Sequence, residues 1–162
     1  MLAAGAIAAG AFLVGLVMVI ANRLCDGLDG AVARASTMTD RGGYLDIVLD
    51  FVFYAAVPLA FAAVDAPRNA LAAAFLLASF LVNGAAFLAF TLMAERNRLS
   101  TEVQGQKSFY YLTGLAEGGE TVAFFVAFCV FPQLFPWLAV LFGCLCFASA
   151  AGRILAAGKL LK

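Results

Sequence analysis

Long apolar segments limit what this chain can fold into more than any other feature of its sequence. The chain has 162 residues, of which 65% are hydrophobic and 12% are charged. A soluble core of this size cannot bury so much apolar surface, whereas a helix of about 20 apolar residues spans a bilayer. We therefore predict an all-α integral membrane protein, a polytopic helical bundle that forms a single domain over residues 1–162.

Five segments are long enough to span a bilayer completely. They cover residues 11 to about 37, 43–64, 70–93, 108–131 and a last stretch from the turn at 132–136 to about 157. A short polar turn at residues 65–69 separates the second and third spans. The first ten residues are apolar but too short to span, and they lack the charged and cleavage regions of a signal peptide. We expect five full transmembrane helices preceded by an N-terminal stub.

One polar stretch between the first two spans concentrates the acids of the chain. Its spacing is D-x2-D-G-x2-A-R-x7-G-x3-D-x3-D, and four of the six aspartates stand at the specified positions of this pattern. On helices, Asp26 and Asp29 share one face, and so do Asp46 and Asp50. Two antiparallel helices joined by a polar loop at residues 35–41 would bring the four carboxylates together.

Clustered carboxylates in an apolar setting predict a metal and phosphate site. Such groups repel one another and lose hydration, so they need cations to offset the cost, and intramembrane acids are generally functional. Oxygen ligands without Cys or His suit magnesium, manganese or calcium. Gly30 and Ala33 leave a strip of helix without large side chains, where a bulky ligand can approach. Arg34 and Arg41 stand where they can hold a phosphate by charge-assisted hydrogen bonds.

The rest of the composition excludes several other chemistries. The chain has no histidine, which removes histidine metal sites and Ser-His or Cys-His catalysis and leaves Asp or Glu as the general base. The formal net charge is zero, so nothing indicates a nucleic-acid partner. The four cysteines lie in apolar segments without metal-ligand spacing, and we interpret them as small buried hydrophobic residues.

The whole pattern resembles the signature of the CDP-alcohol phosphotransferase (CDP-alcohol phosphatidyltransferase) family, integral membrane enzymes of phospholipid biosynthesis. The resemblance runs from about Asn22 to the C-terminus. Within the family, the chain resembles an uncharacterised bacterial inner-membrane branch. The spacer at residues 35–41 is one residue shorter than the commonest form of the family. Every residue type that the signature specifies is present: Asp26, Asp29, Gly30, Ala33, Arg34, Gly42, Asp46 and Asp50.

The resemblance implies a reaction and a set of roles. A substituted phosphate, such as a phosphatidyl group, would pass from CDP-diacylglycerol or another CDP-alcohol to an alcohol acceptor, with release of CMP. Two Mg²⁺ or Mn²⁺ ions would be held by Asp26, Asp29, Asp46 and Asp50, with Asp50 as the catalytic base. The nucleotide and its phosphates would contact Gly30, Ala33, Arg34 and Gly42. Family members have six transmembrane helices, so we expect this chain to lack the N-terminal part. They also form homodimers, and we expect the same of this chain.

Residues elsewhere in the chain are candidate contacts for the acceptor or for a phosphate, and each has a second interpretation. Glu117 and Glu120 either face the aspartates or pair with basic residues at the interface. Asn22 and Arg23 precede the motif, and Arg23 either lines the site or extends to the membrane surface. The basic candidates, which also fit a cytoplasmic flank, are Arg41, Arg96, Arg98 and Lys107.

The basic residues predict an orientation in the membrane. Eight of them fall at the motif end of the bundle, whereas the other end has only Arg68. The positive-inside rule then places the active-site end in the cytoplasm of a multi-pass inner (plasma) membrane protein.

Two further functions stay open at this point. Acidic pairs on facing helices also line divalent-cation transporters or channels, although Gly30, Ala33 and Arg34 have no purpose in an ion path. A catalytically idle, truncated homologue that assembles with partners is the other alternative, and the intact aspartates speak against it. The acceptor alcohol is not identified by any residue in the chain.

Overall fold

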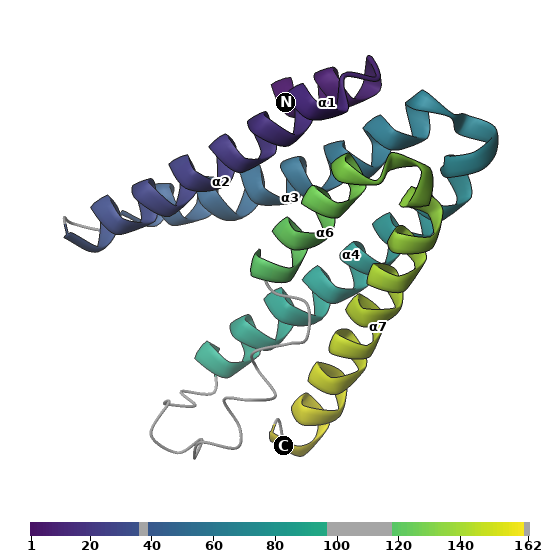
Figure 1. Cartoon of the computed structure of the whole chain (residues 1–162). Coiled ribbons are helices and arrows are strands. Elements are labelled where there is room, and N and C mark those ends of the chain that lie inside the picture. Colours follow the sequence, from purple (N-terminus) through teal and green to yellow (C-terminus); the bar gives the residue numbers. More distant parts are fainter. Residues whose placement is uncertain (36–38, 97–117, 161–162) are drawn as a thin grey trace.

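The computed structural model describes residues 1–35, 39–96 and 118–160, and for residues 26–27, 29–35, 118 and 159–160 it describes the backbone alone. All the elements in these ranges are helical (Figure 1). They are the α-helices α1 (Leu2–Ala8), α2 (Phe12–Ala35), α3 (Asp40–Val64), α4 (Ala66–Arg96), α6 (Gly118–Val130) and α7 (Phe135–Leu160), with the 3₁₀ turn η1 (Pro132–Leu134) before α7. The predicted all-α bundle is confirmed.

Among the described residues, three helices are long and apolar enough to span a membrane: α3, α4 and the segment Pro132–Gly158 that contains α7. Within α2 and α6, the apolar stretches Phe12–Cys25 and Gly119–Val130 are shorter. The predicted first span therefore exists as a 24-residue helix, but only its first half is strongly apolar. The predicted fourth span began at residue 108, and its first part lies outside the described residues.

The predicted N-terminal stub is a short helix that folds back on α2. Gly10 has a φ of 77°, a left-handed conformation that a glycine adopts without steric cost, and it lies in the turn between α1 and α2. The buried side chain of Ile7 then packs on α2 at Gly15, where an added Cβ would lie 2.5 Å from Ile7 Cγ1. Helix α1 contacts both α2 and α3, so it links these two helices.

The turn between α3 and α4 is much tighter than the sequence suggested. We predicted a polar turn over residues 65–69, which is wrong, because only Asp65 lies between the two helices. Asp65 Oδ1 accepts a hydrogen bond from the Arg68 backbone N–H at 3.3 Å and so caps α4. The buried Asn69 donates from Nδ2 to the Phe61 carbonyl at 2.8 Å, which satisfies a backbone group near the end of α3.

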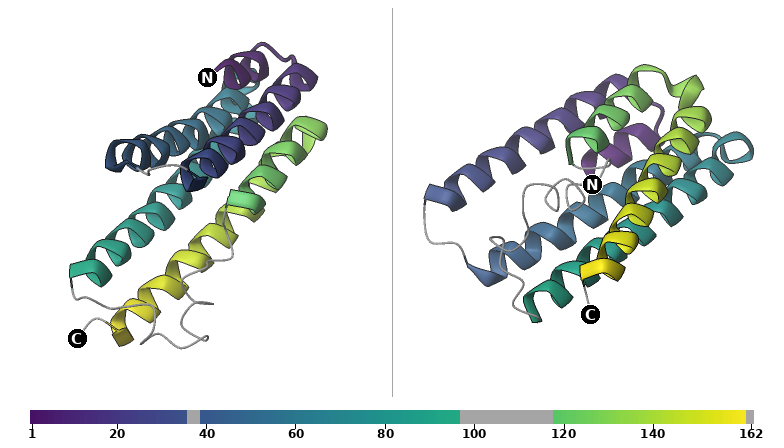
Figure 2. Two further views of the ribbon diagram at one scale, coloured as in Figure 1. Left: turned by 90° about the vertical axis from the view of Figure 1, so that its left-hand side faces the viewer. Right: turned by 90° about the horizontal axis from the view of Figure 1, so that it is seen from below.

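In the described part of the chain, α4 and α7 form the most extensive helix pair (Figure 2). Aromatic rings fill the core beside them. Gly143 of α7 lies against the ring of Phe75 on α4, where an added Cβ would come within 2.6 Å of Cε1. The largest fully buried side chains are mostly phenylalanines: Phe61, Phe125, Phe128, Phe135 and Phe142. Cys129 and Cys146 are buried as we predicted, but Cys25 and Cys144 are exposed, so that prediction is wrong for two of the four cysteines.

The arrangement of α2 and α3 decides the shape of the motif region. In the described part of the chain, α2 packs mainly on α1 and α6, whereas α3 packs on α4 and α1. The two helices that carry the motif run antiparallel (Figure 1) but have few direct contacts with each other. The two motif helices are therefore supported mainly by other parts of the bundle.

Candidate functional site

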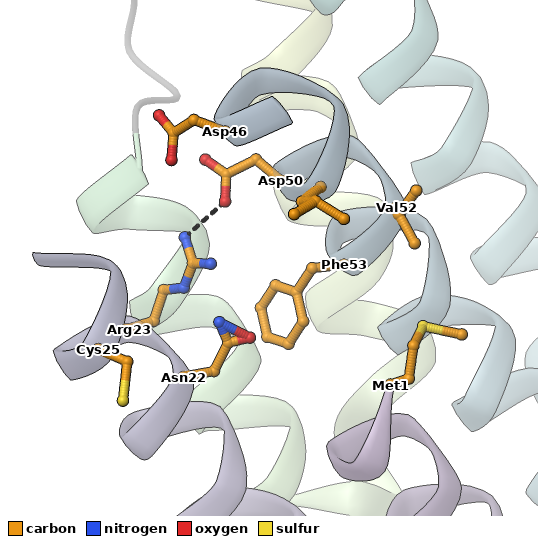
Figure 3. A pocket seen from close by; sticks show the side chains of 9 residues that line it. Met1, Asn22, Arg23, Cys25, Asp46, Asp50, Val52 and Phe53 are labelled. Atoms are coloured by element: carbon orange, nitrogen blue, oxygen red, sulfur yellow. Dashed lines mark ion pairs between the residues drawn. The ribbon is translucent and has the colours of Figure 1, made fainter. Parts of the chain in front are cut away.

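Helix α3 begins at a local signal that sets the position of its two aspartates. The Thr39 hydroxyl accepts a hydrogen bond from the Gly42 N–H at 3.2 Å, which caps the helix, and Asp40 in the first turn interacts favourably with the helix dipole. From this start, Asp46 and Asp50 fall one turn apart on the same face. Both carboxylates point toward α2 (Figure 3).

These aspartates line a cavity between the polar halves of α2 and α3. Its volume is about 320 Å³. The polar side chains come from both helices, since α2 supplies Asn22 and Arg23 and α3 supplies Asp46 and Asp50. The residues that line it are Met1, Asn22, Arg23, Cys25, Asp46, Leu49, Asp50, Val52 and Phe53 (Figure 3).

Asp50 is held from two directions. Its Oδ1 lies 2.9 Å from Arg23 Nη1, an ion pair that joins α3 to α2 across the cavity (Figure 3). Its Oδ2 accepts a hydrogen bond from the Tyr54 hydroxyl at 3.4 Å, at the long end of the usual range. The carboxylate therefore has a defined orientation, with about a quarter of the side chain still exposed (28%).

Arg23 lines the cavity, which agrees with the first of our two interpretations of this residue. The guanidinium carbon lies 4.9 Å from the centroid of the Phe53 ring and 5.8 Å from that of Tyr54. Both distances fall within the range of cation–π attraction. Only 14% of the side chain is exposed, so the charge is largely removed from water.

The donor set on α3 suits a hard divalent cation. Asp46 and Asp50 offer carboxylate oxygens one helical turn apart, in a cavity that also exposes an amide from Asn22. Among the described side chains, no group of three metal-ligating residues is close enough to hold an ion. Asp26 and Asp29 lie on the last turns of α2, and their side chains are outside the described residues. The four-aspartate site therefore stays a prediction, and the described half of it fits a metal.

The remaining predicted site residues fall into two groups. Gly42 lies in the first turn of α3, where its N–H binds Thr39, and Arg41, Arg96 and Glu120 are exposed on α3, α4 and α6. The others have undescribed side chains or lie outside the described residues altogether: Gly30, Ala33, Arg34, Arg98, Lys107 and Glu117.

Sequence reasoning missed three residues that shape this site. Phe53 and Tyr54 follow Asp50 at i+3 and i+4, a spacing that places them beside it on α3, but we had no reason to separate them from other apolar residues. Thr39 was detectable, because a threonine followed by an acid is a common helix start. That signal would have moved the predicted start of the helix from 43 to 40.

The site is an acidic cavity between two helices of an apolar bundle, and the comparison with known proteins shows the family to which the chain belongs. The chain belongs to the CDP-alcohol phosphatidyltransferase family, which matches it over residues 1–146. Among curated proteins, it is similar to the inner membrane protein YnjF of Escherichia coli (strain K12). The two are 46% identical over 148 residues, which cover 91% of this chain and 72% of that protein. No solved structure gives a significant match.

The family membership predicted from the motif is thereby confirmed. It supports a membrane transferase that takes a substituted phosphate group from a CDP-alcohol. The similarity to an inner membrane protein agrees with the three helices that are able to span a bilayer.

Proposed function

We propose that this chain is a CDP-alcohol phosphatidyltransferase of phospholipid biosynthesis, which moves the phosphatidyl group of CDP-diacylglycerol to an alcohol and releases CMP. The observation that carries this proposal is the cavity between α2 and α3, where Asp46 and Asp50 face Arg23. Because the family transfers groups from CDP-alcohols, we infer that the acidic and cationic side chains of this cavity bind the CDP-alcohol donor.

Two divalent ions, Mg²⁺ or Mn²⁺, fit the proposed donor set of Asp26, Asp29, Asp46 and Asp50. When bound, such ions would neutralise the pyrophosphate and stabilise the charge that develops as its bridging bond breaks. The part of the site on α3 supports this assignment, since Asp46 and Asp50 offer in one cavity the carboxylate oxygens that such ions prefer.

The protein's own residues bind and orient the reactants. Asp50 is the proposed base for the acceptor hydroxyl, and its contacts with Arg23 and Tyr54 fix the direction in which its oxygens point. Gly30 and Ala33 leave room for the cytidine, and Arg34 and the first turn of α3 at Gly42 would contact phosphates. Contacts of the acceptor with Arg41, Arg96, Arg98, Lys107, Glu117 or Glu120 are part of the same proposal.

The proposed orientation puts this cavity at the cytoplasmic face. Arg68 lies in the first turn of α4, next to the end of α3 that is opposite Asp46, and it donates a hydrogen bond to the carbonyl of Gln133 in η1. The two turns at that end thus lie together, away from the basic residues of the motif end. We further propose that residues 1–162 form a single domain and that the protein works as a homodimer.

The test is release of CMP by the purified protein in nanodiscs with Mg²⁺, CDP-diacylglycerol and a panel of alcohols. We expect release that requires one of the alcohols and that is lost in Asp50→Asn. Asp65→Asn is the matched control, because it makes the same change outside the cavity at a cap position where asparagine serves equally well.

If no alcohol supports release, also when other CDP-alcohols replace CDP-diacylglycerol, the transferase proposal is wrong. Uptake of Mn²⁺ by liposomes that contain the protein, without any CDP-lipid, would then favour the cation transporter. Absence of both activities would favour the idle homologue.

A further inference from the structure

Arg23 lies outside the motif positions, yet its side chain enters the centre of the proposed site. It precedes Asp26 by about one helical turn on α2 and reaches across the cavity to Asp50 on α3 (Figure 3). The side chains of the pair are 14% and 28% exposed. An ion pair that is partly shielded from water interacts more strongly than one on an open surface.

The surroundings of Arg23 keep its guanidinium in one place. Phe53 and Tyr54 present their rings to it from α3, and the Tyr54 hydroxyl also donates to Asp50. The planar guanidinium suits such stacking, which a lysine ammonium does not reproduce. Since α2 and α3 have few direct contacts, this group of side chains is a specific connection between the two motif helices.

A guanidinium and a divalent cation require the same carboxylate. The Asp50 oxygen that lies 2.9 Å from Arg23 already accepts a charge-assisted hydrogen bond, and the positive charge of Arg23 disfavours a second cation beside it. We propose that Arg23 is a positioning residue that orients Asp50 across the cavity and competes with the divalent cation for its carboxylate. This inference rests on the proposed function, because it requires that the aspartates bind a metal.

The proposal has a consequence that an ordinary structural arginine lacks. Removal of the charge frees Asp50 for the metal, so the metal affinity rises. The same change leaves the carboxylate without its orienting partner, so turnover falls. Tighter metal binding together with slower catalysis is therefore the expected signature.

The experiment measures binding of Mn²⁺ alone to the full chain in nanodiscs, by the electron paramagnetic resonance signal of free Mn²⁺. In Arg23→Gln we expect the dissociation constant for Mn²⁺ to fall at least about fivefold. We expect kcat for CMP release to fall, while KM for the CDP-lipid changes less. Arg68→Gln is the control, because it removes the same charge from the first turn of α4, away from the cavity. It is expected to leave the Mn²⁺ affinity unchanged.

The outcomes separate this inference from the proposed function. Equal or weaker Mn²⁺ binding in Arg23→Gln overturns the competition. If the melting temperature also falls while the Mn²⁺ affinity is unchanged, Arg23 is an ordinary structural residue. If the parent protein binds no Mn²⁺, the proposed metal site itself is wrong and the inference fails with it. If Arg23→Gln does not fold, Phe53→Leu is the second variant, because it keeps the arginine but removes the ring that stacks on the guanidinium. An unchanged Mn²⁺ affinity in Phe53→Leu overturns the proposal.

Discussion

At the scale of single residues, Asp46 and Asp50 reach the cavity from one face of α3, and Arg23 of α2 meets Asp50 across it. The i, i+4 spacing predicted that Asp46 and Asp50 share a face, and both line the cavity. Spacing within one helix carries no information about a side chain on another helix, so the ion pair of Asp50 with Arg23 was not predictable. The roles of Asp26 and Asp29 stay predictions.

Cys25 provides a chemical probe of the cavity at this scale. It is exposed and lines the cavity, whereas Cys129 and Cys146 are buried. We expect a polar maleimide to label Cys25 and expect Mg²⁺ with a soluble cytidine diphosphate ester to slow that reaction at least about tenfold, when the ligand exceeds its Kd about 100-fold.

Variants that retain one cysteine each make the measurement specific, with labelling followed by mass spectrometry. A variant that keeps only Cys144, which is exposed on α7 away from the cavity, is the control and is expected to show no protection. Equal labelling of Cys25 with and without ligand would contradict the assignment of the cavity as the nucleotide site.

At the scale of elements, the long apolar helices were predictable and their ends were not. Helix α3 starts at a Thr39 cap that we overlooked, and α4 starts directly after Asp65 although Pro67 and several polar residues suggested a turn. Proline is tolerated in the first turn of a helix because the N–H that it lacks has no intrahelical partner there. The same residues therefore fit a loop and a helix start, and only the packing of α3 against α4 decides between them.

The contact between α4 and α7 gives a stability prediction at this scale. In Gly143→Ala, the new Cβ would meet the Phe75 ring, so the ring or the helix must shift, and we expect a loss of about 1 to 3 kcal/mol in stability. Thermal melting in detergent, followed by far-ultraviolet circular dichroism, measures the change.

Gly152→Ala in the same helix is the matched control. Nothing lies within 4 Å of its added Cβ, and alanine favours a helix over glycine by about 1 kcal/mol, so we expect an equal or higher melting temperature. Similar melting temperatures for the two variants would contradict the close approach of α4 and α7 at Gly143.

At the scale of the whole molecule, composition alone predicted a helical membrane bundle, and the structure confirms it. The arrangement of the helices was less accessible. We predicted the motif as two antiparallel helices joined by a loop, but the sequence did not indicate what supports them: α2 packs on α1 and α6, and α3 packs on α4 and α1. Such pairings depend on how individual residues fit together, for example the Ile7 side chain against the bare backbone of Gly15, and a hydropathy pattern does not resolve this fit.

Ligands that bridge the two motif helices should stabilise the whole bundle. A CDP-alcohol bound with Mg²⁺ would contact α2 and α3 together, and at about 100 times its Kd a ligand that binds only the folded state adds roughly 2.7 kcal/mol. We therefore expect a higher melting temperature with both ligands than with a chelator. Asp46→Asn, which removes a carboxylate from the cavity, should abolish this rise, and an equal rise in that variant would contradict the proposed site.

The way α2 and α3 are supported also bears on how the motif tolerates evolutionary change. Each helix is anchored to other parts of the bundle, so the connection between Ala35 and Thr39 does not have to hold them in register. Insertions and deletions in this connection therefore leave the spacing within each pair of aspartates unchanged, because each pair lies on a single helix. A spacer one residue shorter than the commonest form, as the resemblance to the family implies, would be a change of that kind and would leave the Thr39 cap and the positions of Asp46 and Asp50 on α3 intact.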